Sequence, residues 1–317
     1  MEENLSNGLV IKPIAEAAQK ILTYIDHRRK GYIKSMKTPW NKMNQVTMGG
    51  LEWQSIIAIA GMSGGGKTAI SGQLETGLVD LNPQENIAVL NFNFEMLAAR
   101  LIGRKLSGGL DLTTRELYSA DENNKVNDYQ YEKIVAEAKK LTQYSIHYVE
   151  MPGTVEMIKN TILKFSEMEG IKGKGIVIFL DHTLLVRGKD GDKEREVLYD
   201  LMAMFNEIKK RIKCIIVVLS QLNRDIEHRD RISEPSQQFP KKSDLFGGDA
   251  LYMYSDIVLV THRPEMLNIT AYGTQQWPTN NKVFFHYLKA RDGEPCTVMM
   301  ENDLAHSKIN DIDRIGF

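Results

Sequence analysis

The sequence has little of what a secreted or membrane-spanning protein needs. It contains two cysteines, Cys214 and Cys296, which are too few for a disulfide framework and too far apart for a metal-binding pair. No apolar run approaches the roughly 20 residues that a helix needs to span a bilayer, and residues 1–10 lack the basic and apolar parts of a signal segment. These absences predict a cytoplasmic protein without a membrane partner.

The sequence also lacks an excess of either charge, with 40 lysines and arginines against 41 aspartates and glutamates. A formal net charge of −1 argues against a protein that coats nucleic acid through its overall charge, although a local basic groove is compatible with it. Hydrophobic residues make up 42% of the 317 residues, which is enough for the core of one large α/β domain or of two small ones.

What the sequence does have is a series of short apolar runs, rich in Val, Ile and Leu, separated by helical stretches. The runs occupy residues 55–60, 86–94, 175–181, 214–220, 256–262 and 283–289. Continuous apolar strands that alternate with helices predict an α/β fold, in which helices flank both faces of a mostly parallel central sheet. Ligands of such sheets bind at the carboxyl ends of the strands.

An amphipathic segment with a basic end precedes these runs. Ile14, Ala17, Ile21 and Ile25 recur at helical spacing, so residues 12–36 are predicted to form one helix. Its apolar stripe would pack either on its own domain or on a neighbouring subunit, and the residues alone leave both alternatives open.

The segment after the first apolar run is the most specific motif. Residues 61–68 have the sequence GMSGGGKT. Glycines let successive N–H groups turn toward phosphate oxygens, Lys67 at the start of a helix can reach the β- and γ-phosphates, and Thr68 can bind Mg²⁺. Strand, loop and helix occur in the order that a P-loop requires, so this segment is predicted to bind a nucleotide.

Polar residues end three of the other runs, where a ligand is expected. Asp181 follows five apolar residues and is predicted to belong to the Mg²⁺ shell, although a cap or a salt bridge would also satisfy it. Glu95 is predicted to polarise the attacking water, with a helix-terminal carboxylate as the alternative. Gln221 could sense the γ-phosphate, or it could simply be a polar strand end.

Two further segments carry charge. Residues 223–249 show little apolar periodicity, and between Arg224 and Asp244 they contain five basic and five acidic residues. Such a loop is either functional or merely solvated. The last strand ends in LKARDG, where alternation puts Lys289 and Arg291 on one face. These two cations are predicted to complete the active site of a neighbouring subunit, and the alternative is ordinary surface charge.

The motifs GMSGGGKT, NFNFEM, IVIFLDH, VVLSQLNR, SDLFGGDALYMYSDIVLVTHR and LKARDG occur in this order. From about Met43 to Glu301 the chain therefore resembles the ATPase domain of DnaB-type replicative helicases. The resemblance implies a RecA-like P-loop fold preceded by a linker helix, and a ring hexamer that moves along single-stranded DNA with ATP and Mg²⁺. It also implies a primase or a helicase loader as a partner, and a linker arm at residues 1–45, an ATPase domain at 46–303 and a tail at 304–317.

The resemblance assigns a role to each matching residue. Lys67 holds phosphate, Glu95 activates water, Gln221 couples the γ-phosphate to the DNA loop, and Lys289 and Arg291 act in trans. The metal is held by Thr68 and Asp181. The nucleotide is contacted by Ser63, Gly64, Gly65, Gly66, Lys67, Thr68, Ala69 and Arg104.

The sequence departs from the family in two respects. The family's separate N-terminal helical domain has no counterpart in the roughly 50 residues before the first strand, which favours a shortened helicase encoded by a phage or a plasmid of a bacterial host. The arginine of the family's central DNA-binding loop is also missing, since Phe246, Gly247 and Gly248 follow the SDL motif. DNA contact is then expected from the backbone N–H groups of these glycines and from Arg224, Lys241, Lys242 and Phe246.

Two alternative functions share much of this pattern. A RecA-like recombinase, or a DNA-stimulated ATPase that does not unwind, would have the same core. A nucleotide-gated loader without catalysis would need no water-activating carboxylate, so Glu95 argues against it.

Overall fold

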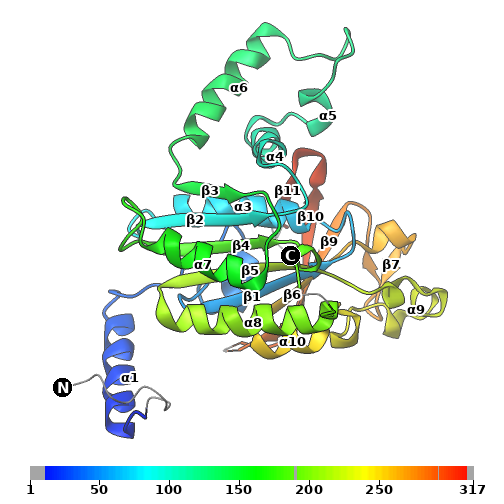
Figure 1. Ribbon diagram of the computed structural model, residues 1–317. Helices are drawn as coiled ribbons and strands as arrows, with labels where there is room; N and C mark the ends of the chain where they lie inside the picture. Colours follow the sequence, from blue (N-terminus) through cyan, green and yellow to red (C-terminus); the bar gives the residue numbers. More distant parts are fainter. Residues whose placement is uncertain (1–10, 189–190, 292, 313–317) are drawn as a thin grey trace. The chain divides into compact units, whose positions relative to one another are not determined.

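The computed structural model describes residues 11–188, 191–291 and 293–312, and the chain divides into two units, Met1–Ser35 and Met36–Phe317 (Figure 1). In the first unit, α1 (Ile14–Arg29) is an amphipathic helix with no buried residue. Gly31 has a φ of 75°, a left-handed conformation that ends helices. The helix predicted over residues 12–36 therefore ends earlier than expected.

The second unit is built on a sheet of nine strands in the described residues, in the order β11-β10-β9-β6-β1-β5-β4-β2-β3. The strands from β6 to β3 in this order run parallel, and the other three extend the sheet antiparallel from β6. The predicted mostly parallel sheet is thus confirmed. The strands are β1 (Ser55–Gly61), β2 (Ile87–Asn93), β3 (Ile146–Val149), β4 (Gly175–Asp181), β5 (Cys214–Gln221), β6 (Ile257–His262), β9 (Lys282–Ala290), β10 (Cys296–Asp303) and β11 (Lys308–Asp311), with β7 (Ala271–Tyr272) and β8 (Trp277–Pro278) in a separate hairpin.

Helices cover both faces of this sheet, as Figure 1 shows. One face packs on α7, α8 and α10, and the other packs on α2 and α3. The helices of the second unit are α2 (Asn41–Val46), α3 (Lys67–Asp80), α4 (Ala98–Leu110), α5 (Thr114–Leu117), α6 (Asp128–Leu141), α7 (Val155–Ser166), α8 (Glu194–Arg211), α9 (Arg229–Ser233) and α10 (Gly248–Tyr254). Within the described ranges, no helix combines the length and the apolar composition needed to cross a bilayer.

The two covered faces explain the continuous apolar runs of the sequence. Every residue of β1, β2 and β4 is buried, so both alternating sets of side chains along these strands are mostly apolar. By contrast, the residues of β3 and most of those of β10 are only partly buried. These strands lack a continuous apolar run for that reason, and the sequence did not predict them.

The second unit extends beyond both predicted domain boundaries. Before residue 46, the side chains of Met36, Trp40 and Met43 are at most 1% exposed and belong to the core under the sheet. After residue 303, β11 pairs with β10, and the carbonyl of Ile309 accepts a hydrogen bond from Trp40 Nε1 at 2.7 Å. Residues 36–45 and 304–311 are therefore parts of the sheet domain rather than of an arm and a tail.

Candidate functional site

The loop between β1 and α3 has the geometry that its glycines predict. Gly64 and Gly66 have φ values of 72° and 98°, which side-chain-bearing residues rarely adopt. A Cβ atom on Gly66 would also lie 2.9 Å from Ile309 Cδ1. The loop therefore needs glycine at both positions, and it leads directly into the amino terminus of α3 at Lys67.

Lys67 is held across the mouth of this loop. Its Nζ donates hydrogen bonds to the carbonyl oxygens of Gly61 at 2.8 Å and of Met62 at 3.0 Å. Burial lowers the pKa of Lys67, while the negative charges of Asp181 and Glu95 oppose that shift. A partly buried cation near two carboxylates would gain further from an anionic ligand in the loop.

The residues predicted to bind nucleotide and metal line one depression at the carboxyl edge of the parallel strands. The register of the sheet explains why these residues meet. Gly61 at the end of β1 pairs with Gln221 at the end of β5, and Asn93 at the end of β2 pairs with Asp181 at the end of β4, so the four strands end side by side. The lining residues among those predictions are Ser63, Gly64, Gly65, Gly66, Lys67, Thr68, Ala69, Glu95, Arg104, Asp181 and Gln221. Their chemical roles stay predictions.

Asp181 has the electrostatic character expected of a metal ligand. Burial raises its pKa to about 6, and Glu95 adds to that rise, while Lys67 and Arg104 act in the opposite direction. The two cations thus leave the carboxylate charge incompletely compensated. A divalent cation would compensate it, and oxygen donors from Asp181 and Thr68 suit Mg²⁺, so these residues fit the metal that the resemblance implies.

A buried ion pair brings Arg104 to this depression. The next residue on α4, Lys105, pairs with Glu75 of α3 at 3.0 Å, and these side chains are 7% and 1% exposed. Glu75 also accepts hydrogen bonds from Asn91 at 2.7 Å and from Tyr148 at 3.0 Å. This network fixes α4 against α3, so Arg104 faces both the phosphate loop and an adjoining hollow between α3, α4 and α6.

Sequence reasoning missed Arg263, which also lines the depression. It follows β6, and its Nη1 donates to the carbonyl of Gly64 at 3.1 Å. On the same strand, Thr261 Oγ1 donates to the carbonyl of Gly65 at 2.6 Å. The sequence offered one signal, a charged residue at the end of an apolar strand. Arg263 reaches the phosphate loop only because β6 lies beside β1, and the sequence pattern does not reveal that order of strands.

Lys289 and Arg291 lie at the other edge of the sheet. The N–H of Arg291 donates to Asp256 O at 2.9 Å, and the N–H of Asp256 donates to Ile56 O at 2.8 Å, near the start of β1. The phosphate loop follows the end of β1, so a strand of seven residues, roughly 20 Å at 3.3 Å per residue, separates the two cations from it. They do not meet their own phosphate loop.

Arg291 is held at that edge by a carboxylate. Its Nη1 pairs with Asp256 Oδ1 at 2.7 Å, while Oδ2 of the same carboxylate accepts from Lys209 Nζ at 2.7 Å and from the N–H of Ile56 at 2.8 Å. The Arg291 side chain is still 54% exposed. The guanidinium is therefore oriented by contacts within its own chain and is accessible to solvent.

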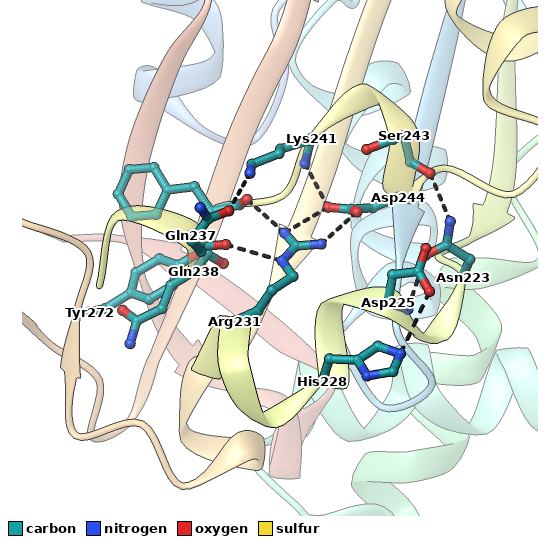
Figure 2. Close-up of polar contacts among 11 residues, drawn as sticks. Asn223, Asp225, His228, Arg231, Gln237, Gln238, Lys241, Ser243, Asp244 and Tyr272 are labelled. Atoms are coloured by element: carbon teal, nitrogen blue, oxygen red, sulfur yellow. Dashed lines mark hydrogen bonds and ion pairs between the residues drawn. The ribbon is translucent and has the colours of Figure 1, made fainter. Parts of the chain in front are cut away.

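The segment after β5 is compact rather than irregular. Figure 2 shows Arg231 at its centre, with Nη1 and Nη2 bonded to the Asp244 carboxylate at 2.6 and 2.9 Å. Arg231 also donates to the carbonyls of Gln237 and Phe239, both at 3.1 Å. These contacts fold the stretch that contains η2 (Arg224–Glu227), α9, η3 (Pro235–Gln237) and η4 (Lys242–Asp244).

This segment carries the residues predicted to contact DNA, and it touches Gln221. The N–H of Phe246 donates to the carbonyl of Gln221 at 3.1 Å, while Arg224, Lys241 and Lys242 are exposed. One expectation needs correction, because the N–H of Gly248 already donates to Leu245 O at 3.0 Å. Gly248 therefore does not offer the backbone donor that was predicted for it.

Comparisons with known proteins agree with this architecture. Residues 35–311 match the family model described as the DnaB-like helicase C terminal domain. That match covers most of the chain. The chain belongs to this family. The resemblance inferred from the motifs is thereby confirmed.

Individual relatives agree with the family match. The chain is 27% identical over 261 residues to the replicative DNA helicase DnaB of Helicobacter pylori, covering 80% of this chain and 49% of that protein. It is 23% identical over 222 residues to a probable plasmid replicative DNA helicase of Chlamydia trachomatis, covering 67% and 43%. The chain thus spans about half the length of the curated relatives that it matches.

Solved structures match the fold at lower sequence identity. One that is described as an ATPase domain superposes with a TM-score of 0.79 at 18% identity, covering 96% of this chain and 100% of that one. A DnaB-like replicative helicase, described with its interactions with primase, gives a TM-score of 0.76 at 17% identity, covering 95% and 72%. These likenesses confirm the RecA-like fold of the DnaB family.

Proposed function

We propose that this chain is the ATP-hydrolysing motor of a replicative DNA helicase, which works as a ring-shaped homo-oligomer, expected to be a hexamer, on single-stranded DNA in a bacterial cytoplasm. The observation that carries the proposal is the separation of Lys289 and Arg291 from their own phosphate loop. Two exposed or half-exposed cations at the far edge of the sheet can serve a triphosphate only if a neighbouring subunit presents it.

In the proposed reaction, the glycine-rich loop holds the triphosphate of ATP through its N–H groups, and Lys67 exchanges its two carbonyl partners for phosphate oxygens. Mg²⁺, held by Thr68 and Asp181, would neutralise phosphate charge. Glu95 accepts a proton from the attacking water. Arg291 and Lys289 of the adjacent subunit stabilise the charge that develops in the transition state.

Coupling to DNA is proposed to run through Gln221. Its side chain lines the nucleotide depression, and its carbonyl holds the N–H of Phe246 in the segment that carries Lys241, Lys242 and Gly247. A shift of Gln221 on loss of the γ-phosphate would therefore move that segment. Lysine side chains suit a DNA backbone because phosphate contacts require no base sequence.

The first unit is proposed to hold the ring together. An amphipathic helix of this length normally owes its stability to packing of its apolar stripe. We propose that α1 docks on the adjacent subunit, and that a primase or a helicase loader binds the assembled ring.

The test mixes two inactive variants. Lys67→Ala removes the phosphate lysine, and Arg291→Ala removes the trans cation, so each homogeneous ring should lose ATP hydrolysis. A mixed ring contains interfaces in which an intact loop faces an intact arginine, and the mixture should recover part of the DNA-stimulated rate. Full activity of Arg291→Ala alone would refute the shared site, and helical filaments on DNA in electron micrographs would favour the recombinase alternative.

A further inference from the structure

A second charged hollow lies beside the segment that follows β5. Its wall is formed by Arg195, Lys242, Ser243, Leu245, Phe246, Gly247, Gly248 and Asp249. The Asp249 carboxylate bridges two cations across it, with Oδ2 at 2.8 Å from Arg195 Nη2 and Oδ1 at 3.2 Å from Lys242 Nζ. The cations come from separate elements, since Arg195 lies in α8 and Lys242 in η4.

The stability of the fold does not explain this arrangement. Arg195 lies in the first turn of α8, where the helix dipole disfavours a cation by some tenths of a kcal/mol to ~1 kcal/mol. The side chains of Arg195, Lys242 and Asp249 are 65%, 52% and 50% exposed, and ion pairs this exposed contribute about 0–1 kcal/mol. The two ion pairs therefore contribute little to the free energy of folding.

Each cation has a second support that does not depend on Asp249. The guanidinium carbon of Arg195 lies 6.0 Å from the centre of the Tyr199 ring, and Lys242 Nζ lies 5.1 Å from the centre of the Tyr252 ring. These distances suit cation–π attraction. Both cations would thus keep their positions if the carboxylate moved away.

A carboxylate between an arginine and a lysine occupies the place of a phosphate, since both anions present two oxygens to such donors. We propose that Arg195 and Lys242 form a binding site for a backbone phosphate of single-stranded DNA, and that Asp249 fills this site until DNA displaces it. Gly247 lies in the wall of the hollow and packs closely on α8, since a Cβ atom there would lie 2.2 Å from Leu198 Cδ2. The proposal rests on the DNA-binding role proposed above, and it adds both Arg195 and the competing Asp249.

Because Asp249 is proposed to compete with DNA for the two cations, substitutions of Asp249 and of Arg195 should change the affinity for DNA in opposite directions. Asp249→Asn removes the competing charge and should tighten DNA binding by roughly three- to tenfold. Arg195→Gln should weaken binding by a similar factor and should reduce the dependence of log Kd on log salt concentration by about 0.7, the value for one phosphate of a single strand. In the double variant, Arg195→Gln should cancel the gain from Asp249→Asn.

The experiment measures binding of a fluorescent oligo-dT to the full chain, with a non-hydrolysable ATP analogue, over a range of salt concentrations. Arg211→Gln is the matched control, because this arginine lies in the last turn of the same helix and pairs with Glu207. It should bind DNA as the wild type does. Thermal unfolding of each variant verifies that it folds, and inorganic phosphate at equal ionic strength tests whether a free anion competes for the same site.

The outcomes separate this proposal from the proposed function. If the wild type binds DNA but Asp249→Asn binds no more tightly, or Arg195→Gln no more weakly, the phosphate site is refuted and the helicase proposal stands. If neither the wild type nor Asp249→Asn binds DNA, both the phosphate site and the DNA-binding role are refuted.

Discussion

At the scale of single residues, burial acts against the charges of the proposed nucleotide site. Burial lowers the pKa of Lys67 and raises that of Asp181 to about 6, so each group is pushed toward its neutral form. A phosphate beside Lys67 and a metal beside Asp181 would reverse both shifts. Binding of ATP and Mg²⁺ in the proposed arrangement should therefore stabilise the charged forms of both residues.

Lys67→Ala and Glu95→Gln should separate nucleotide binding from hydrolysis. Loss of the Lys67 ammonium removes a direct phosphate contact, so ATP binding should weaken and hydrolysis should fall by at least about 100-fold. Glu95→Gln keeps the side-chain shape but cannot accept a proton, so it should bind ATP normally and lose hydrolysis by a similar factor. Binding of a fluorescent ATP analogue and phosphate release measure the two steps, and hydrolysis at the wild-type rate by Glu95→Gln would assign the water to another base.

The sequence predicted site residues where a local pattern was sufficient. Asp181 and Gln221 stand out because each ends a buried apolar run, and Gly64 and Gly66 stand out because of the loop motif. Arg263 could not be predicted in the same way, since its place beside the phosphate loop follows from the pairing of β6 with β1 across about 200 residues of chain. Local patterns do not encode such a non-local order of strands.

At the scale of elements, α10 joins the segment that is proposed to bind DNA to the two cations that are proposed to act in trans. Lys289 Nζ donates to the carbonyl of Tyr252 at 2.6 Å and lies 5.2 Å from the centre of the Tyr252 ring. The Tyr252 hydroxyl donates to Leu288 O at 3.3 Å. The helix that begins at Gly248 thus ends against the strand that carries Lys289.

Tyr252→Ala keeps the backbone carbonyl that accepts from Lys289 but removes the ring beneath its ammonium, so it should loosen Lys289 without changing the nucleotide site proposed for its own chain. If Lys289 acts in trans as proposed, ATP hydrolysis should fall by roughly three- to tenfold, while ATP binding stays at the wild-type level. Tyr252→Phe is the control, because it keeps the ring beneath the ammonium. Since its own phosphate loop is intact, Tyr252→Ala should also be partly rescued by Lys67→Ala subunits in mixed rings. If Lys67→Ala subunits did not rescue the variant, the loss of ATP hydrolysis would have to arise within the Tyr252→Ala subunit rather than at its neighbour.

The ion pair of Arg231 and Asp244 should be the main support of the segment after β5. Asp244 is 1% exposed, and its carboxylate accepts two bonds from Arg231 and one from the N–H of Lys241. Asp244→Ala would leave a half-buried guanidinium unpaired, which should lower the free energy of unfolding by about 3 kcal/mol. The exposed pair of Lys172 and Glu167 is the control, and Glu167→Ala should change stability by less than about 0.5 kcal/mol in urea unfolding. Equal effects of the two substitutions would contradict this assignment.

At the scale of the whole molecule, the fully buried strands were predictable, and the partly buried ones, parallel β3 as well as antiparallel β10, were not. Strands that are buried on both faces can be recognised in the sequence by continuous Val, Ile and Leu residues, as in β1, β4 and β5. Partly buried strands such as β10, and short closing strands such as β11, gain their stability from pairing with a neighbour that is already in place. The C-terminal domain boundary was misplaced for this reason, whereas the N-terminal boundary was misplaced because Met36, Trp40 and Met43 pack into the core from a segment without an apolar run.

The acid stability of the second unit should be governed by a buried histidine pair on that antiparallel side. His262 Nδ1 and His286 Nε2 lie 2.7 and 2.9 Å from the hydroxyl oxygen of Tyr272. Burial lowers the pKa of His262 to about 3, with Arg231 adding to the shift and Asp244 opposing it, and burial followed by His262 lowers that of His286 well below its usual range. Both rings are therefore neutral in the folded chain at neutral pH.

A histidine whose pKa is lower in the folded than in the unfolded chain stabilises the fold above about pH 6.5 and loses that contribution as the pH falls toward its folded pKa. Each such histidine should reduce the free energy of unfolding by up to about 1.4 kcal/mol per pH unit below 6.5.

The measurement has to exclude Asp181, because its raised pKa makes it stabilise the fold as the pH falls below 6. Urea unfolding should therefore be measured from pH 8 to pH 5 in the Asp181→Asn background. There His262→Gln should flatten the acid slope, whereas His228→Gln, which changes a side chain that is 72% exposed, should leave it unchanged. The same slope in both variants would show that the buried pair does not set the acid limit of the fold.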